Sequence, residues 1–171
     1  CVYGTSPVAS PTSPVVTPTP SPLTNFRLKL YWEEGYDWQE EEFEREWCMK
    51  CRNSGCNLGN KIYIYECSEI SERFDFVHAN DDEVLIKLDG TNTCLERDFR
   101  EIYIKACDAG NSNQRWFAKV GEFDQSRFEI SLNTFSSFCI TQRHHPKRDE
   151  EVLLEKCTQA RDGLTSFWNR Y

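Results

Sequence analysis

The sequence predicts an all-β fold made of three repeats with about four short strands each. Three stretches show the repetition most clearly, because each alternates apolar and polar residues and ends in cysteine: residues 61–67, 101–107 and 151–157. Such alternation is typical of a strand with one buried face. One unit of this kind cannot bury its apolar face alone, so three copies predict a closed structure with pseudo-threefold symmetry.

The other strands of each unit follow the same order in all three copies. Each unit opens with an apolar strand, at residues 26–30, 84–88 and 128–132. A strand whose second residue is cysteine comes next, at residues 47–50, 93–96 and 138–141. Each unit closes with an aromatic segment, at residues 74–76, 114–117 and 167–168. Large rings at these positions are expected to fill the interior of a barrel.

This order, together with Asn113-Gln114-Arg115-Trp116, resembles the ricin B-type lectin domain, which is a β-trefoil with a Gln-x-Trp signature in each repeat. The resemblance covers residues 26–171 through the repeat spacing and the cysteines. Only the second repeat carries the signature itself. The first repeat offers Phe74-Asp-Phe76 in its place, and the third offers Ser166-Phe-Trp168. The resemblance therefore implies a β-trefoil with degenerate repeats.

The resemblance also implies where a sugar would bind. Ricin-type lectins use an acid two residues after the first cysteine of a repeat, an aromatic platform near the second cysteine, and an Asn just before Gln-x-Trp. Carried over by position, the second repeat supplies Glu96, Asn113 and Gln114, but it has Lys105 where an aromatic residue is expected. The second repeat is therefore the best candidate for a carbohydrate site.

The first and third repeats depart further from this pattern. The first repeat has Tyr65 for the platform, yet Lys50 stands in place of the acid. The third repeat has Thr141 and Glu155 at the two positions. Because no repeat keeps the whole constellation, we expect weak or absent binding of simple galactosides.

Nine cysteines favour disulfides in a secreted, extracellular protein, because reducing compartments keep thiols free. Repeat equivalence implies the bridges Cys48–Cys67, Cys94–Cys107 and Cys139–Cys157. A turn-forming stretch separates Cys51 from Cys56, which favours a fourth bridge, so Cys1 has no partner within the domain. The alternative is a zinc ion on the four cysteines of the first repeat. We expect no metal, because the other repeats carry the equivalents of Cys48 and Cys67 without the extra pair.

Charge and hydropathy limit the partners. The net charge is −8, and all of it lies in residues 26–171. A phosphate backbone would be repelled, so we expect no nucleic acid partner. No stretch reaches the length of an apolar membrane span. The chain opens on cysteine, so we expect a mature or partial chain, with a lipid-modified Cys1 as an alternative.

Residues 1–25 form a separate Ser/Thr/Pro-rich arm before the domain at residues 26–171. Six of the seven prolines lie in the arm, and each follows Ser or Thr. The arm resembles the stalks of mucins and of hydroxyproline-rich glycoproteins, and its prolines favour extended polyproline II. Expected O-glycosylation sites are Thr5, Ser6, Ser10, Thr12, Ser13, Thr17, Thr19, Ser21 and Thr24, and candidate hydroxyprolines are Pro7, Pro11, Pro14, Pro18, Pro20 and Pro22.

The arm suggests self-association. At about 3.1 Å per residue it could reach roughly 75 Å, whereas the domain is only about 40 Å across. We therefore expect a structural subunit of an extracellular glycoprotein assembly or filament, in which the arm docks on other copies of the chain. The expected docking residues are apolar: Val2, Tyr3, Val8, Val15, Val16 and Leu23. A carbohydrate-binding module is the alternative function, and a flexible spacer is the alternative role of the arm. We expect neither enzymatic activity nor a cofactor.

Two further segments are interpreted as loops. Residues 33–47 are acidic and aromatic, but their carboxylates follow no calcium-loop spacing. The adjacent His144 and His145 point apart in most conformations, so a metal site there is disfavoured.

Overall fold

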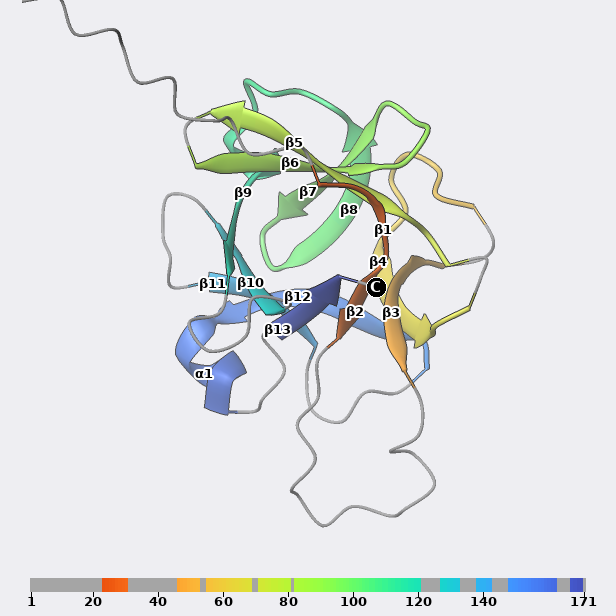
Figure 1. The fold of residues 1–171 in the computed structure, drawn as a ribbon, viewed down its shortest axis with the longest axis vertical. Coiled ribbons are helices and arrows are strands. Elements are labelled where there is room, and N and C mark those ends of the chain that lie inside the picture. The colour runs from red at the N-terminus through yellow and green to blue at the C-terminus, as the bar shows by residue number, and fades with distance from the viewer. Residues whose placement is uncertain are drawn as a thin grey trace, which may run out of the picture.

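A computed structural model describes residues 23–30, 46–52, 55–68, 71–80, 82–120, 127–132, 138–142, 148–162 and 167–170. These residues form thirteen strands, one short α-helix and one 3-10 helix, so the chain is nearly all β, as predicted (Figure 1). The arm at residues 1–22, most of the acidic segment and the histidine pair lie outside the described residues. No helix among the described residues is long and apolar enough to cross a membrane.

The strands group into the three expected repeats. The first repeat contains β1 (Leu23–Phe26), β2 (Leu28–Leu30), β3 (Trp47–Cys51), β4 (Ile62–Glu66) and β5 (Phe74–Asn80). The second contains β6 (Glu83–Leu88), β7 (Thr93–Asp98), β8 (Glu101–Ala106), the 3-10 helix η2 (Ser112–Gln114) and β9 (Arg115–Val120). The third contains β10 (Arg127–Leu132), β11 (Phe138–Gln142), β12 (Glu150–Lys156), α1 (Cys157–Asp162) and β13 (Phe167–Arg170). Every predicted strand is present, and the first one is interrupted at Arg27.

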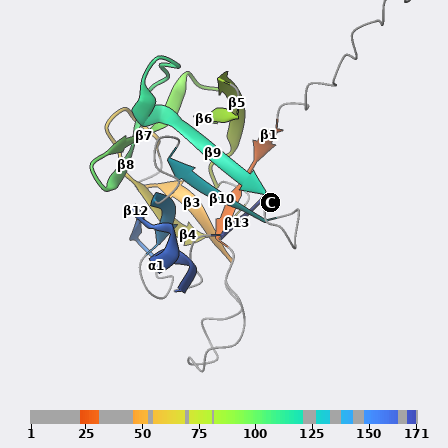
Figure 2. The same cartoon turned by 90° about the vertical axis from the view of Figure 1, so that its left-hand side faces the viewer.

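The first and last strands of each repeat close into a barrel. Antiparallel pairs run from β5 to β6, β6 to β9, β9 to β10, β10 to β13 and β13 to β2. The ring is completed by β1, which leads into β2 and pairs with β5. Figure 2 shows β9 and β10 side by side in this barrel. Closure leaves these strands without the free edges of an open sheet.

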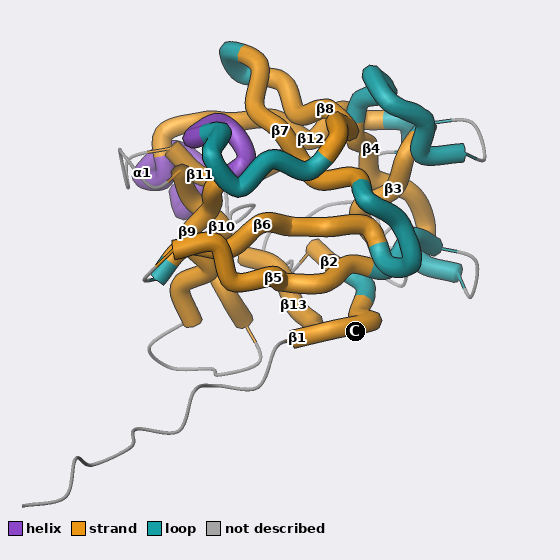
Figure 3. The backbone as a smooth tube through the Cα atoms, turned by 90° about the horizontal axis from the view of Figure 1, so that it is seen from above, coloured by secondary structure: helices purple, strands orange, loops and turns teal. Residues whose placement is uncertain are grey.

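Three hairpins form a cap on the barrel (Figure 3). They are β3–β4, β7–β8 and β11–β12. The hairpins meet through equivalent residues: Lys61 lies opposite Tyr103, Glu101 opposite Leu153, and Glu151 opposite Tyr63. A barrel with three such hairpins is the β-trefoil architecture.

One predicted equivalence in the barrel interior is wrong. Trp116 and Trp168 are fully buried, and each indole Nε1 donates to a backbone carbonyl, that of Leu95 and of Ile140 respectively. The residue in the same register in the first repeat is Phe74 rather than Phe76, as the partners of these aromatic residues on the paired strands show.

Each of the three aromatic residues pairs with the first residue of one opening strand and the last residue of another. Trp116 lies opposite Val84 and Leu132, and Phe74 lies opposite Phe26 and Leu88. The first-repeat counterpart of Gln-x-Trp is therefore Glu72-Arg73-Phe74. The sequence comparison instead set Phe76 against Trp116. Phe74 follows Cys67 by seven residues, whereas Trp116 follows Cys107 by nine, so the first repeat is two residues shorter here.

The four expected disulfides are present. Cys48–Cys67, Cys94–Cys107 and Cys139–Cys157 each tie the two strands of a cap hairpin, and all three have a Cα–Cα separation of 4.9 Å. The fourth bridge, Cys51–Cys56, belongs to the first repeat alone, with a Cα–Cα separation of 5.3 Å. Four disulfides fit an extracellular protein, because reducing compartments keep thiols free.

The β-sheet begins earlier than the predicted domain boundary. Leu23 pairs with Phe76, the backbone N–H of Asn25 donates to the Asp75 carboxylate at 2.8 Å, and Arg73 donates to the Asn25 carbonyl at 3.1 Å. Leu23, Thr24 and Asn25 therefore belong to the trefoil, although they were assigned to the arm. The Leu23 backbone pairs within its own chain, while its side chain is 37% exposed, so its expected role in docking stays a prediction.

Candidate functional site

The β7–β8 hairpin of the second repeat presents its polar residues on one face. Leu95 and Ile104, which lie opposite each other, are fully buried in the core. Since strand residues alternate between faces, Glu96, Tyr103 and Lys105 lie on the outer face. Glu96 is directly opposite Tyr103. The tight hairpin therefore places a carboxylate, an aromatic ring and an ammonium group within one small area.

The carboxylate of Glu96 is held in place by two amides. Asn111 Nδ2 donates to Glu96 Oε2 at 2.9 Å, and Gln114 Nε2 donates to the same oxygen at 2.7 Å. Among the residues that the structure describes, none donates to Oε1. The arrangement fixes the side chain and leaves one acceptor oxygen for a ligand.

Gln114, expected as a ligand-binding residue, positions Glu96 instead. Its side chain is 1% exposed. Besides binding Glu96, its Nε2 donates to the carbonyl of Ala106 at 2.8 Å, and its Oε1 accepts from the backbone N–H of Asp108 at 2.8 Å. Since these bonds occupy the amide and burial hides it, Gln114 links the hairpin to η2 and does not face a ligand.

Asn113 belongs to η2 and lies between Asn111 and Gln114, the two residues whose amides bind Glu96. Asn111 caps η2, and its Oδ1 accepts from the backbone N–H of Asn113 at 3.0 Å. Arg97 Nη2 donates to Asn113 Oδ1 at 2.9 Å. This bond fixes which end of the Asn113 amide faces Arg97, and the amide nitrogen on the other end is a potential donor. The sequence did not single out Asn111 or Arg97. The Asn two residues before Asn113 was the available signal, because such spacing is typical of a capping side chain.

The aromatic residue of this face is Tyr103, which the sequence prediction missed. Its ring lies 5.8 Å from Lys105 Nζ and 5.9 Å from Lys61 Nζ, so it stacks beneath two cations. Its hydroxyl donates to the Glu101 carboxylate, and this bond raises the pKa of Tyr103. The two-residue turn at residues 99–100 could have indicated its place, because it sets Glu96 opposite Tyr103.

Tyr65 lies on another hairpin, β3–β4, so the structure does not bring it together with Glu96. Lys50 Nζ lies 5.6 Å from its ring centroid. The Tyr65 hydroxyl donates to the Asp149 carboxylate. Burial, with this hydrogen bond, raises the pKa of Tyr65 to about 12. In the third repeat Thr141 is fully buried and cannot serve as an exposed acceptor.

Two clusters contain metal-ligating atoms within 4.8 Å of one another. They are Cys51, Cys56 and Glu72, and Glu129, Cys139 and Cys157. The cysteines of both clusters are paired in disulfides, which leaves one carboxylate in each. The zinc alternative also needs Cys48 and Cys67, and these two cysteines form a disulfide with each other. The described residues therefore form no thiolate set for zinc.

Solved structures share the fold. A designed 3-fold symmetric protein, ThreeFoil, aligns with a TM-score of 0.63 at 12% sequence identity, covering 84% of this chain and 96% of that one. Cytolethal distending toxin from Actinobacillus actinomycetemcomitans aligns with a TM-score of 0.62 at 14% identity, covering 85% and 90%. The agglutinin from Abrus precatorius aligns over 86% and 80% of the two chains at 14% identity, with a TM-score of only 0.34. No protein-family model and no curated protein sequence matches the chain.

Proposed function

We propose that the protein is a carbohydrate-binding module and that the outer face of the β7–β8 hairpin binds the sugar. The observation that carries this proposal is the fixed Glu96 carboxylate, whose Oε2 is held by two amides. A carboxylate oxygen accepts well from sugar hydroxyls. Because the protein itself already orders this side chain, little conformational entropy is lost when a ligand binds.

The neighbouring groups complement such an acceptor. Lys105 on the same face and the Asn113 amide nitrogen in the neighbouring η2 are further donors, so a ligand with several hydroxyl groups can both donate and accept. The ring of Tyr103 lies directly opposite Glu96. We propose binding without catalysis, because the contacts of Glu96 are amides and not a nucleophile.

Glu96→Gln tests this proposal, since it preserves shape and removes the charged acceptor. Wild-type protein is applied to an array of neutral glycans, and the strongest ligand is measured by titration calorimetry. We expect Glu96→Gln to weaken binding at least tenfold, about 1.4 kcal/mol.

The matched control is Lys50→Ala, which changes the same strand position in the first repeat and should bind like wild type. Equal binding by Glu96→Gln, or no binding of any glycan by the wild type, contradicts the proposal.

A second candidate function is a structural subunit of a secreted glycoprotein assembly. Its support is the cysteine count, because four disulfides use eight of the nine cysteines and leave Cys1 at the tip of the arm. In this proposal the arm carries O-glycans and docks non-covalently on a neighbouring trefoil. Copies of the chain joined head to tail in this way would form an open filament.

Deletion of residues 1–22 tests the second candidate. The deletion stops before Leu23, because that residue already belongs to the sheet. Light scattering on protein from a host that adds O-glycans should show that the full chain assembles and the truncated chain is a folded monomer. If both assemble alike, the arm is only a spacer.

A further inference from the structure

Phe99 forms the tip of the β7–β8 hairpin and is 86% exposed. This hairpin is the shortest of the three, since its disulfide spans a sequence separation of 13, against 19 and 18 in the other two. Phe99 and Arg100 alone connect Asp98 with Glu101, which lie opposite each other. The short connection leaves the ring in solvent with little loop around it.

The backbone at this position does not favour a phenylalanine. Phe99 has counterparts in Gly59 and Asp149, because the three lie two positions before residues 101, 61 and 151, where the hairpins meet. The backbone φ is positive at all three: 57° at Phe99, 88° at Gly59 and 67° at Asp149. Glycine adopts this conformation freely and Asp tolerates it, whereas a bulky side chain does not. The fold would therefore be served better by Gly at residue 99. Local strain at an exposed aromatic residue supports a functional hypothesis.

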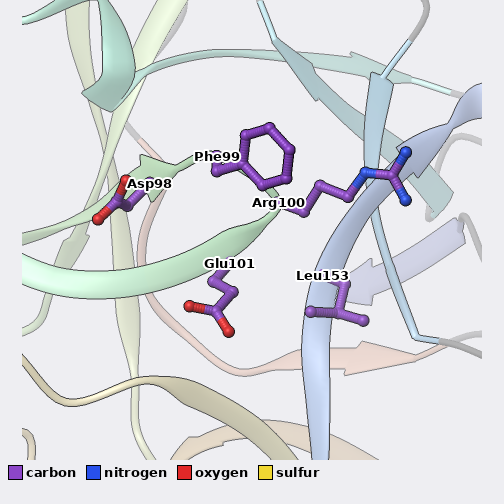
Figure 4. Close-up of a pocket in the computed structure, with 5 residues that line it drawn as sticks. All are labelled: Asp98, Phe99, Arg100, Glu101 and Leu153. Carbon is purple, nitrogen blue, oxygen red and sulfur yellow. The ribbon is translucent and has the colours of Figure 1, made fainter.

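Phe99 borders a hollow of about 310 Å³ that is also lined by Asp98, Arg100, Glu101 and Leu153. In Figure 4, Arg100 extends past Leu153 on β12, while Glu101 points to the other side of the opening. The backbone N–H of Leu154 donates to the carbonyl of Arg100 at 2.9 Å, which anchors the turn to β12. The volume is at the lower end of the range for small-ligand sites.

The polar groups of this hollow include both charge signs. Glu101 accepts from Lys61 Nζ at 2.5 Å and from the Tyr103 hydroxyl. These bonds lower the pKa of Glu101, so its carboxylate is charged at neutral pH. Arg100 adds a guanidinium and Asp98 a second carboxylate. Such a mixture fits a neutral ligand with many hydroxyl groups better than it fits an ion.

The hollow continues the face that carries Glu96. The pair Asp98–Glu101 is the next outer-face pair along the hairpin after Glu96–Tyr103. Phe99 follows Glu96 by three positions along the hairpin, a distance of about 10 Å at the rise of an extended strand. This length exceeds what a single sugar ring covers.

We infer that the two areas are subsites of one extended site for a neutral oligosaccharide, with Phe99 stacking against a sugar ring at the hollow. The inference rests on the proposed function for the class of ligand. Arg100 and the acidic pair bind hydroxyls at the edge of that ring. Phe99 is an isolated exposed aromatic among the described residues of the second repeat, whereas a protein interface needs a broader apolar core.

The test uses neutral oligosaccharides of one to six units, based on glucose, galactose or N-acetylglucosamine, and the full-length protein. We expect wild-type affinity to rise with length. In Phe99→Gly, affinity for the longer sugars should fall at least tenfold toward that of the single sugar, while the melting temperature is unchanged or higher because Gly suits the positive φ. Leu58→Ala is the matched control, since Leu58 is 62% exposed in the equivalent turn of the first repeat.

The outcomes separate the two proposals. If Glu96→Gln loses binding and Phe99→Gly keeps the full dependence on length, the proposed function stands and the extended site is refuted. If Phe99→Gly instead lowers the melting temperature, the ring has a structural role and the inference fails. If Phe99→Gly changes only self-association measured by light scattering, the hollow holds a second copy of the chain and the inference also fails.

Discussion

Glu72 and Gln114 occupy the same place in two repeats, two residues before Phe74 and Trp116. The Gln114 amide makes three hydrogen bonds and is satisfied. Glu72 Oε2 is buried without a donor among the described residues. Burial raises the pKa of Glu72. A carboxylate therefore stands where the fold provides a site suited to an amide.

Glu72→Gln is expected to stabilise the protein at pH 7 by at most about 1 kcal/mol, because it removes the charge of a half-buried carboxylate whose Oε2 has no donor among the described residues, while solvent screens part of that charge. The raised folded-state pKa means that folding favours the protonated acid. Stability is therefore lost as pH rises from the unfolded value, about 4.3, through the folded one. Urea unfolding should show the gain at pH 7 and almost none at pH 4. A gain that persists at pH 4 would show that ionisation of Glu72 is not its cause.

Differences in turn length explain which of these residues could be predicted from the sequence. Asn113, Gln114 and Glu96 were recognisable because the second repeat keeps the signature spacing. Phe74 was not, since the turn before it is two residues shorter and only strand register reveals the equivalence. Tyr103 was missed for a related reason, because its partnership with Glu96 depends on the length of the hairpin turn.

At the scale of elements, the three cap hairpins meet at an ion-pair triad. Lys61, Glu101 and Glu151 stand at the same position in three repeats, and Lys61 Nζ lies 2.5 Å from Glu101 Oε1 and 3.0 Å from Glu151 Oε1. Tyr63 also donates to Glu151, at 3.2 Å. Three identical charges would repel one another here, so departure from symmetry makes the junction favourable.

Lys61→Met should destabilise the protein by about 0.5–1 kcal/mol at pH 7, a small value because all three side chains are partly exposed and screened by solvent. The hydrogen bond from Lys61 lowers the pKa of Glu101 and also raises that of Lys61. The contribution of Glu101 is present above about pH 4.3 and is lost as pH falls through its folded pKa, whereas that of Lys61 persists until strongly alkaline pH. Denaturation of Lys61→Met and wild type should therefore converge near pH 3. A constant difference from pH 3 to 7 would contradict the ion-pair explanation.

The disulfides of the hairpins should differ in their effect on stability. In the loop-entropy description, a bridge closing about 20 residues contributes about 3.3 kcal/mol and one closing about 6 residues about 2.2 kcal/mol. Replacing Cys48 and Cys67 by Ala should therefore cost more than replacing Cys51 and Cys56. Denaturant titration of the two double variants measures this order. The reverse order would show that packing around Cys51, which is buried, outweighs the loop entropy.

At the scale of the molecule, the sequence predicted the trefoil, because three copies of strand order and cysteine spacing reflect the architecture directly. Three of the four disulfides followed from the same repetition, and the fourth, Cys51–Cys56, followed from the turn-forming stretch between its cysteines. The boundary between the arm and the trefoil could not be predicted from the sequence, since Leu23 pairs with β5 through backbone hydrogen bonds that leave no pattern in side chains. The site was predicted in part: Glu96 lies on the outer face of the β7–β8 hairpin and Asn113 lies in the adjacent η2, whereas Gln114 is buried and Tyr65 belongs to another hairpin.

The three repeats share one backbone plan and differ in what they present. In the first repeat, Lys50 and Asp149 engage Tyr65, and in the third Thr141 is buried. Among the described residues, only those of the second repeat combine a fixed carboxylate with the shortest hairpin and an exposed aromatic tip. We therefore expect sugar binding in one repeat of a symmetric scaffold.

Backbone amide chemical shifts, recorded while a neutral oligosaccharide is titrated into the full-length protein, test that claim most directly. We predict that perturbations cluster at residues 96–105, 111–113 and 153–154, the last two at the hollow beside Phe99, with the remaining amides of the equivalent hairpins at residues 48–66 and 139–152 unchanged. Perturbations centred on the first or third repeat, or none with any oligosaccharide, would contradict it.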